Sequence, residues 1–160
     1  MTRVESAKLN CDICEIKTAI YQYAHLIDSG DLEGVARLFA AGKLVSQDEA
    51  GQVVDIVGAE AIQSLYASYI RLYEESGTPQ TLHMTSNIVV AIDSDGLSAS
   101  AKSYAVVFQA LADFPLQPII GVRYYDKFIK GSRGWQFQER RIDTHLVGDL
   151  SRHMTRSAIR

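Results

Sequence analysis

The sequence predicts a single α+β domain, in which three helices come first and a curved, mixed or antiparallel sheet wraps around them. Two observations predict it. Apolar residues recur at intervals of three and four in the first half of the chain, and long β-rich runs separated by short turns fill the second half. The 160 residues suffice for one domain with its own core.

The first helix is expected from residue 13 to Asp28, where Ser29 and Gly30 follow. A short second helix should begin after Asp31, a suitable N-cap residue. A third helix is expected over residues 58–75, ended by glycine and proline. The apolar stripes of these helices are Ile13, Ile16, Ile20, Tyr23 and Ile27; then Leu32, Val35, Leu38 and Phe39; then Ile62, Leu65, Tyr66, Tyr69 and Tyr73.

The strands fall into a short hairpin between the second and third helices and a set of long runs at the end of the chain. The expected strands are residues 43–47, 52–57, 82–92, 97–112, 119–130 and 135–146, with a break at Pro115 and Pro118. The last four exceed the usual strand length, so the sheet has to curve around the helices. Its outer face, with Val106, Ile120, Val122 and Tyr124, should be covered by a second copy of the chain, in a dimer or a trimer.

Composition excludes several classes of function. Hydrophobic residues make up 47% and charged residues 22%, and the net charge is −3, so neither nucleic acid nor membrane is expected as a partner. No secretory signal or membrane-spanning run is visible, which predicts a cytoplasmic protein. Cys11 and Cys14 lack the second pair that a zinc site needs, and they are expected to be reduced thiols. No phosphate-binding loop or metal-binding motif occurs, so neither cofactor nor metal is expected.

Two polar residues are placed where chemistry could occur. His83 begins a strand whose alternation would put Thr85, Asn87 and Val89 on the same face, and this face is either the pocket or the solvent side. An isolated histidine on a strand is more often structural. Asp28 lies at a helix C-terminus, where a negative charge is unfavourable unless a donor or cation meets it. A histidine would serve, because the carboxylate would fix its tautomer and stabilise its charged form.

Five segments together resemble the SnoaL-like branch of the NTF2-like superfamily, in the order that the family has them. They are residues 19–39, 57–62, 82–87, 121–126 and 134–137. The resemblance implies a cone-shaped fold over residues 1–147. Residues 148–160 would form a C-terminal tail that is either mobile or closed over the pocket mouth.

The resemblance also implies chemistry. In the branch that contains scytalone dehydratase, hexachlorocyclohexane dehydrochlorinase and bile acid 7α-dehydratase, an aspartate and a histidine at the positions of Asp28 and His83 form the base of an elimination. Tyr23 matches a pocket position. The family's late-strand arginine matches Arg140, or Arg141 if the register differs by one residue. Gln47 and Gln109 replace pocket residues of scytalone dehydratase, which weakens any transfer of its substrate.

Other residues are weaker candidates for the pocket. Arg123 and Tyr125 share a strand face and would either bind substrate or form a subunit contact, and Asn87 is a further candidate.

The leading hypothesis is a cofactor-independent lyase, of the dehydratase type, or an isomerase. It would act on a small hydrophobic molecule, such as a cyclic or aromatic one, in an interior pocket. One alternative is a non-catalytic binding domain. The other is the small subunit of a ring-hydroxylating dioxygenase, which would require a larger partner.

Overall fold

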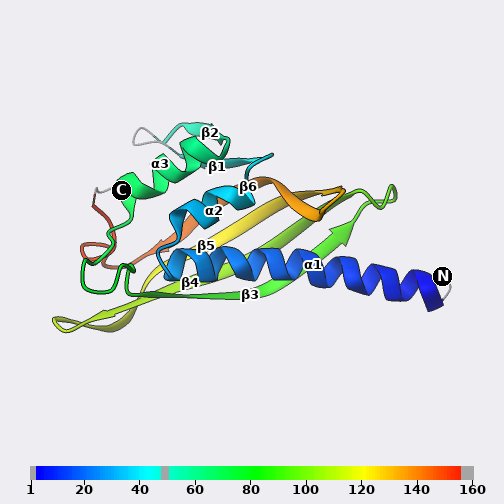
Figure 1. Cartoon of the computed structure of the whole chain (residues 1–160). Helices are drawn as coiled ribbons and strands as arrows, with labels where there is room; N and C mark the ends of the chain where they lie inside the picture. Colours follow the sequence, from blue (N-terminus) through cyan, green and yellow to red (C-terminus); the bar gives the residue numbers. More distant parts are fainter. Residues whose placement is uncertain (1–2, 48–50, 156–160) are drawn as a thin grey trace.

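The computed structural model describes residues 3–47 and 51–155. Three helices and six strands form one α+β unit (Figure 1). The helices are α1 (Arg3–Asp28), α2 (Leu32–Leu38) and α3 (Ala59–Tyr69), and the strands are β1 (Lys43–Gln47), β2 (Val53–Val57), β3 (Thr81–Ile92), β4 (Ser98–Leu111), β5 (Phe114–Gly131) and β6 (Gly134–Val147).

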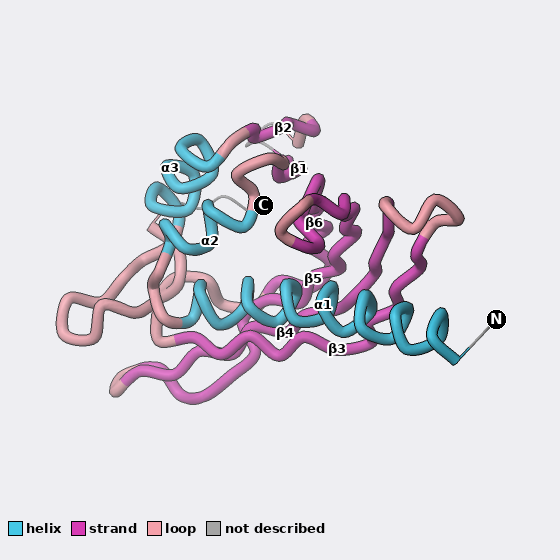
Figure 2. Tube along the Cα trace, turned by 45° about the vertical axis from the view of Figure 1, so that its right-hand side comes forward, coloured by secondary structure: helices cyan, strands magenta, loops and turns pink. Residues whose placement is uncertain are grey.

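The six strands form one curved sheet in the order β2-β1-β6-β5-β4-β3. Only β1 and β6 pair in parallel, and all other neighbours are antiparallel, so the sheet is mixed. Helix α1 runs along the sheet, and the strands curl from β3 round to β2 on either side of it (Figure 2). The predicted fold, a cone of three helices and a curved sheet, is confirmed.

Three boundaries differ from the prediction by more than two residues. Helix α1 begins ten residues earlier, at Arg3. Helix α3 ends at Tyr69, because Ile70 takes an extended conformation and bridges to Met154. Strand β5 continues back to Phe114, through the expected proline break. Its pairing with β6 starts only at Ile120. Pro115 and Pro118 therefore lie in a part of β5 that is unpaired on the β6 side, where a strand tolerates residues that lack a backbone N–H.

The inner face of the sheet packs against the helices and forms the core. On β4 this face carries small residues, among them Ala101, Ser103 and Ala105, and each of these is paired with a buried residue of β5. Two residues expected on the outer face, Val122 and Tyr124, are in fact inside, because their register partners on β4 are the buried Ala105 and Ser103.

Ile120 is inside as well, opposite Val107, so only Val106 of the four expected residues lies on the outer face. That face is nevertheless apolar. It exposes Leu82, Met84, Tyr104 and Leu146, each by at least 47%. No helix in the described part of the chain is long and apolar enough to cross a membrane.

Candidate functional site

Asp28 and His83 meet where the end of α1 touches the start of β3. The Nδ1 atom of His83 lies 2.6 Å from Oδ1 of Asp28, and both side chains are mostly buried. The backbone N–H of His83 donates to Oδ2 of the same carboxylate at 2.8 Å, and the hydroxyl of Thr81 donates to Oδ1 at 2.8 Å. Three donors therefore fix the carboxylate from one short stretch of strand.

The turn that follows α1 makes this approach possible. Gly30 has φ 78°, in the left-handed region that glycine adopts without strain. A Cβ atom at this position would lie 2.2 Å from the carbonyl oxygen of Gly77. The loop before β3 can thus pass close beneath the end of α1, which brings Thr81 and His83 within reach of Asp28.

The charge state of Asp28 follows from its partners. Burial alone would raise the pKa of this carboxyl group, but the hydrogen bonds and charge of His83, together with Thr81, outweigh burial and hold the pKa below its ordinary value. The ionised carboxylate can only accept hydrogen bonds, so Nδ1 of His83 has to carry a proton. When the imidazole is neutral, Nε2 is therefore the unprotonated nitrogen that can take up a proton.

A second cluster of polar side chains lies deeper, between α1 and the sheet. The hydroxyls of Tyr23 and Tyr66 are 2.6 Å apart, and both rings are buried. Burial raises the pKa of both phenols, so both keep their protons. Only one of the two protons is used in the bond between them, and the buried Tyr124 hydroxyl is a further hydrogen-bond partner of Tyr23.

Arg140 joins this group from β6. Its guanidinium makes two hydrogen bonds to Asp126, at 2.8 and 2.7 Å, and both side chains are fully buried. The same guanidinium lies 4.2 Å from the ring centroids of Tyr23 and Tyr124. Its Nη1 atom has no hydrogen-bond partner among the described residues. Arg140, and not Arg141, is thus the arginine that faces inward.

The structure does not bring the weaker candidates to this interior. Arg141 is exposed and stacks on Tyr125, 4.7 Å away, on the outer face of the sheet. Arg123 lies on that face too, over the ring of Tyr104. The register places these three residues on the outer face and their neighbours Tyr124, Asp126 and Arg140 on the inner face, so for Arg123 and Tyr125 the alternative of a subunit contact stays open.

Asn87 is also misplaced by the sequence alternation. The pairing of β3 with β4 shifts between Ser86 and Val89, and Asn87 takes a left-handed φ of 53° within this bulge. Before the bulge the odd-numbered residues of β3 point inward, and after it the even-numbered residues do. Asn87 and Val89 are exposed, whereas Ile88 and Val90 are half-buried and pack against the core.

Of two further interior residues, Gln109 was matched to a pocket position by the family resemblance, whereas His153 was missed. Gln109 is the register partner of Thr81 and is buried, and its amide nitrogen donates to the carbonyls of Pro79 and Arg152 at 2.9 and 3.3 Å. His153, which was assigned to the tail, is 6% exposed and close enough to the pair for the charges of His83 and Asp28 to act on its ionisation. No sequence period links residues so far apart in the chain.

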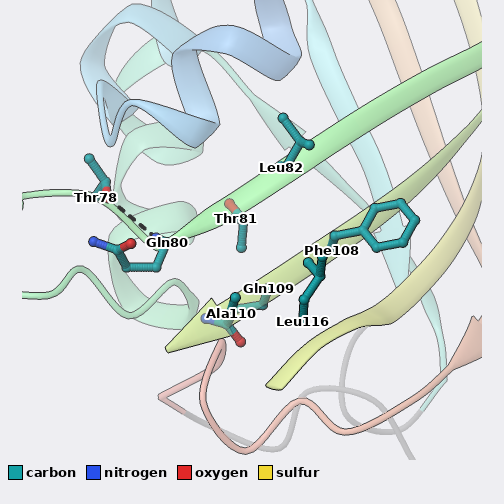
Figure 3. A pocket seen from close by; sticks show the side chains of 8 residues that line it. All are labelled: Thr78, Gln80, Thr81, Leu82, Phe108, Gln109, Ala110 and Leu116. Carbon is teal, nitrogen blue, oxygen red and sulfur yellow. Dashed lines mark hydrogen bonds between the residues drawn. The ribbon is translucent and has the colours of Figure 1, made fainter. Parts of the chain in front are cut away.

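A hollow of about 260 Å³ lies at the ends of β3 and β4, and its lining includes neither Asp28 nor His83. Thr81 and Gln109 line it together with Leu82, Phe108 and Leu116 (Figure 3). Gln47 lies at the exposed end of β1, away from these residues. Among the described residues no cluster of histidine, cysteine or acidic side chains could hold a metal ion, and Cys11 and Cys14 are exposed, free thiols.

Solved structures of similar fold include three that match the chain over nearly its whole length. An NTF2-like protein from Novosphingobium aromaticivorans has a TM-score of 0.73 at 22% identity, with 92% of this chain and 90% of that chain covered. A protein provisionally assigned as a scytalone dehydratase from the same organism has a TM-score of 0.68 at 17% identity, with 90% and 91% covered. A variant of Rv3472, a Mycobacterium tuberculosis protein of unknown function, has a TM-score of 0.68 at 23% identity, with 92% and 78% covered.

No curated protein matches the chain. At these identities the solved structures show the fold alone. The profile of the SnoaL-like domain matches residues 10–141, which include Asp28, His83 and Arg140. The chain therefore belongs to the SnoaL-like domain family, and its fold is that of the NTF2-like proteins.

Proposed function

We propose that the protein is a cofactor-independent lyase of the dehydratase type, or an isomerase, that acts on a small hydrophobic substrate through a general base formed by Asp28 and His83. The observation that carries the proposal is the 2.6 Å contact between Oδ1 of Asp28 and Nδ1 of His83. It supports a base because the protonated Nδ1 leaves Nε2 free to remove a proton from carbon.

The remaining bonds of Asp28 support the same role. A carboxylate that only paired with an imidazole could rotate, but the backbone N–H of His83 and the hydroxyl of Thr81 hold both oxygens. The imidazolium that forms after proton uptake then keeps a close, ionised partner. Charge developed on His83 is thereby stabilised in a buried site, where electrostatic interactions are stronger than in water.

The tyrosine and arginine group supports the second half of such a reaction. Removal of a proton next to a carbonyl places negative charge on oxygen, which needs a donor. The hydroxyls of Tyr23 and Tyr66 use one of their two protons in the bond between them, the Tyr124 hydroxyl is a further hydrogen-bond partner of Tyr23, and Nη1 of Arg140 has no hydrogen-bond partner among the described residues. Tyr23 precedes Asp28 by five residues on one helix, about 7.5 Å along its axis, a distance that one small molecule spans.

The experiment compares the wild-type chain with Asp28→Asn and His83→Gln on a panel of small cyclic hydroxyketones and β,γ-unsaturated ketones. Loss of water or migration of the double bond is followed by absorbance. Both variants should lose at least about 100-fold in rate on any substrate that the wild type converts, the contribution typical of a general base.

Matched controls are Asp95→Asn, at an exposed turn, and His145→Gln, on the outer face. Both should keep the wild-type rate. Undiminished turnover by Asp28→Asn and His83→Gln would disprove the mechanism. Tight binding of panel members without any conversion would favour the alternative, a non-catalytic binding domain.

A further inference from the structure

His153 lies on a C-terminal segment, residues 148–155, that is folded against the rest of the domain. The carbonyl of His153 accepts a hydrogen bond from the backbone N–H of Arg71 at 2.9 Å, and Met154 bridges to Ile70. The backbone N–H of Thr155 donates to the carbonyl of Tyr69 at 2.8 Å. The alternative of a mobile tail therefore does not hold for these residues, which continue the sheet-like pairing beyond the end of α3.

A second anchor connects the segment to the Asp28 and His83 pair. The carbonyl of Arg152 accepts hydrogen bonds from the hydroxyl of Tyr73 at 2.6 Å and from the amide of Gln109 at 3.3 Å. Gln109 is the register partner of Thr81, whose hydroxyl holds Asp28. The residue that follows Arg152 is thus fixed at the same end of the inner sheet face as the pair.

The side chain of His153 is buried and incompletely satisfied. It is 6% exposed, and its Nδ1 atom has no hydrogen-bond partner among the described residues. Burial, helped by the positive charge of His83 and opposed by Asp28, lowers its pKa to about 4. At neutral pH this imidazole is uncharged, and a neutral imidazole always has one N–H to donate.

We propose that His153 is a second catalytic residue, whose imidazole N–H donates a hydrogen bond to the substrate oxygen while His83 removes the proton from the neighbouring carbon. This rests on the proposed function. The C–H bond breaks, its proton passes to Nε2 of His83, and its electron pair moves into the enolate, whose oxygen accepts the hydrogen bond. His153 keeps its own proton, so the step needs no further reactant.

A neutral donor suits this position better than a cation. A second imidazolium beside His83 would repel the charge that His83 acquires when it takes up the proton. An uncharged N–H gives the developing oxyanion a hydrogen bond without that repulsion. His153 would thus bind the carbonyl oxygen next to the acidic carbon, in addition to the donors already named for it.

The test uses binding, so it does not depend on turnover. The probes are 4-nitrophenol, whose phenolate resembles an enolate oxygen, and 4-nitrotoluene, which has the same shape without the oxygen. His153→Leu removes the donor, and His153→Gln replaces it with an amide N–H. We expect His153→Leu to bind 4-nitrophenol at least tenfold more weakly, His153→Gln to recover most of the affinity, and both to bind 4-nitrotoluene as the wild type does.

In spectra of ¹⁵N-histidine-labelled protein, 4-nitrophenol should shift the His153 resonances, whereas 4-nitrotoluene should not. Equal losses for both probes, unchanged 4-nitrophenol affinity in His153→Leu, or no 4-nitrophenol binding to the wild type would each overturn the proposal. The two proposals fail separately. Loss of turnover in His83→Gln with normal probe binding in His153→Leu leaves the base in place and removes only the role of His153.

Discussion

Replacement of Asp28 with asparagine should reverse the tautomer of His83 while the fold persists. The backbone N–H of His83 donates to Asp28 at 2.8 Å and cannot become an acceptor, so the single oxygen of the asparagine amide has to face it. The amide NH₂ group then faces Nδ1 of His83. Two donors cannot share a contact of 2.6 Å, so the imidazole proton moves to Nε2 and Nδ1 becomes the acceptor. The nitrogen that should act as the base is thereby lost.

The cost in stability follows from the three bonds that the carboxylate accepts. A hydrogen bond to a charged group contributes about 1.5–3 kcal/mol and a neutral one about 0.5–1.5 kcal/mol. The substitution makes the remaining bonds neutral, at a loss of about 1 kcal/mol each. Asp28→Asn should therefore lower the free energy of unfolding by about 2–3 kcal/mol, as measured by urea denaturation at neutral pH.

The pH dependence gives a check with a fixed sign. The folded-state pKa of Asp28 is depressed, so its contribution is fully present above the unfolded-state pKa, about 3.9, and is lost as the pH falls through the folded-state pKa. The stability gap between the wild type and Asp28→Asn should close in acid.

The tautomer is read from ¹⁵N spectra of histidine-labelled protein, at a pH where His83 is neutral. In Asp28→Asn the protonated and unprotonated nitrogen signals of His83 should exchange places. Asp95→Asn is the control, because Asp95 also accepts three hydrogen bonds, but at an exposed turn. If His83 keeps its proton on Nδ1 in Asp28→Asn, the account of this site is refuted.

Three further predictions concern the core, the C-terminal segment and the outer face. Arg140→Met leaves Asp126 buried without its partner and should lower the free energy of unfolding by about 3–5 kcal/mol in urea, whereas the exposed Arg133→Met should change it by less than about 0.5 kcal/mol. The pKa of His153 is lowered to about 4 in the folded state, so the unfolded state binds more protons below about pH 6.5. Stability should then fall by up to about 3 kcal/mol between pH 6.5 and 4, a loss that His153→Gln abolishes. The outer face should join copies of the chain: light scattering should give the mass of two or three chains, and Met84→Lys should shift it toward one.

The fold was predictable because its signals are local. The apolar stripe of α1 and the long runs of β3 to β6 each lie within one stretch of sequence, and the period of each stretch identifies its element. Errors arose where the end of an element, or the face that a residue occupies, depends on an interaction with a distant part of the sequence. The end of α3 depends on the bridge between Ile70 and Met154, and the face that Asn87 occupies depends on a bulge against β4. Neither interaction produces a periodic pattern of apolar residues in the sequence.

The site was predictable only in part, for the same physical reason. Asp28 drew attention because its charge is unfavourable at a helix C-terminus, and this local conflict indicated a partner elsewhere. Asp126 and Arg140 gave no such signal, since each lies in a strand where alternation allows either face. His153 lay beyond the last predicted strand, and only the pairing of its segment with the end of α3 brings it inside.

The energetics of the interior favour a ligand over a purely structural role for its polar groups. Removal of two charges from water costs several kcal/mol per ion, and apolar side chains of similar volume often replace a buried ion pair without loss of stability. The domain nevertheless buries Arg140 with Asp126, and within the described part of the chain Nη1 of Arg140, Nδ1 of His153 and two other buried polar atoms have no hydrogen-bond partner. An unpaired buried donor further lowers the stability of the fold. The oxygen of the proposed substrate could accept a hydrogen bond from Nη1 of Arg140, but not from Oε1 of Gln109, which is itself an acceptor, so it would satisfy only part of this set.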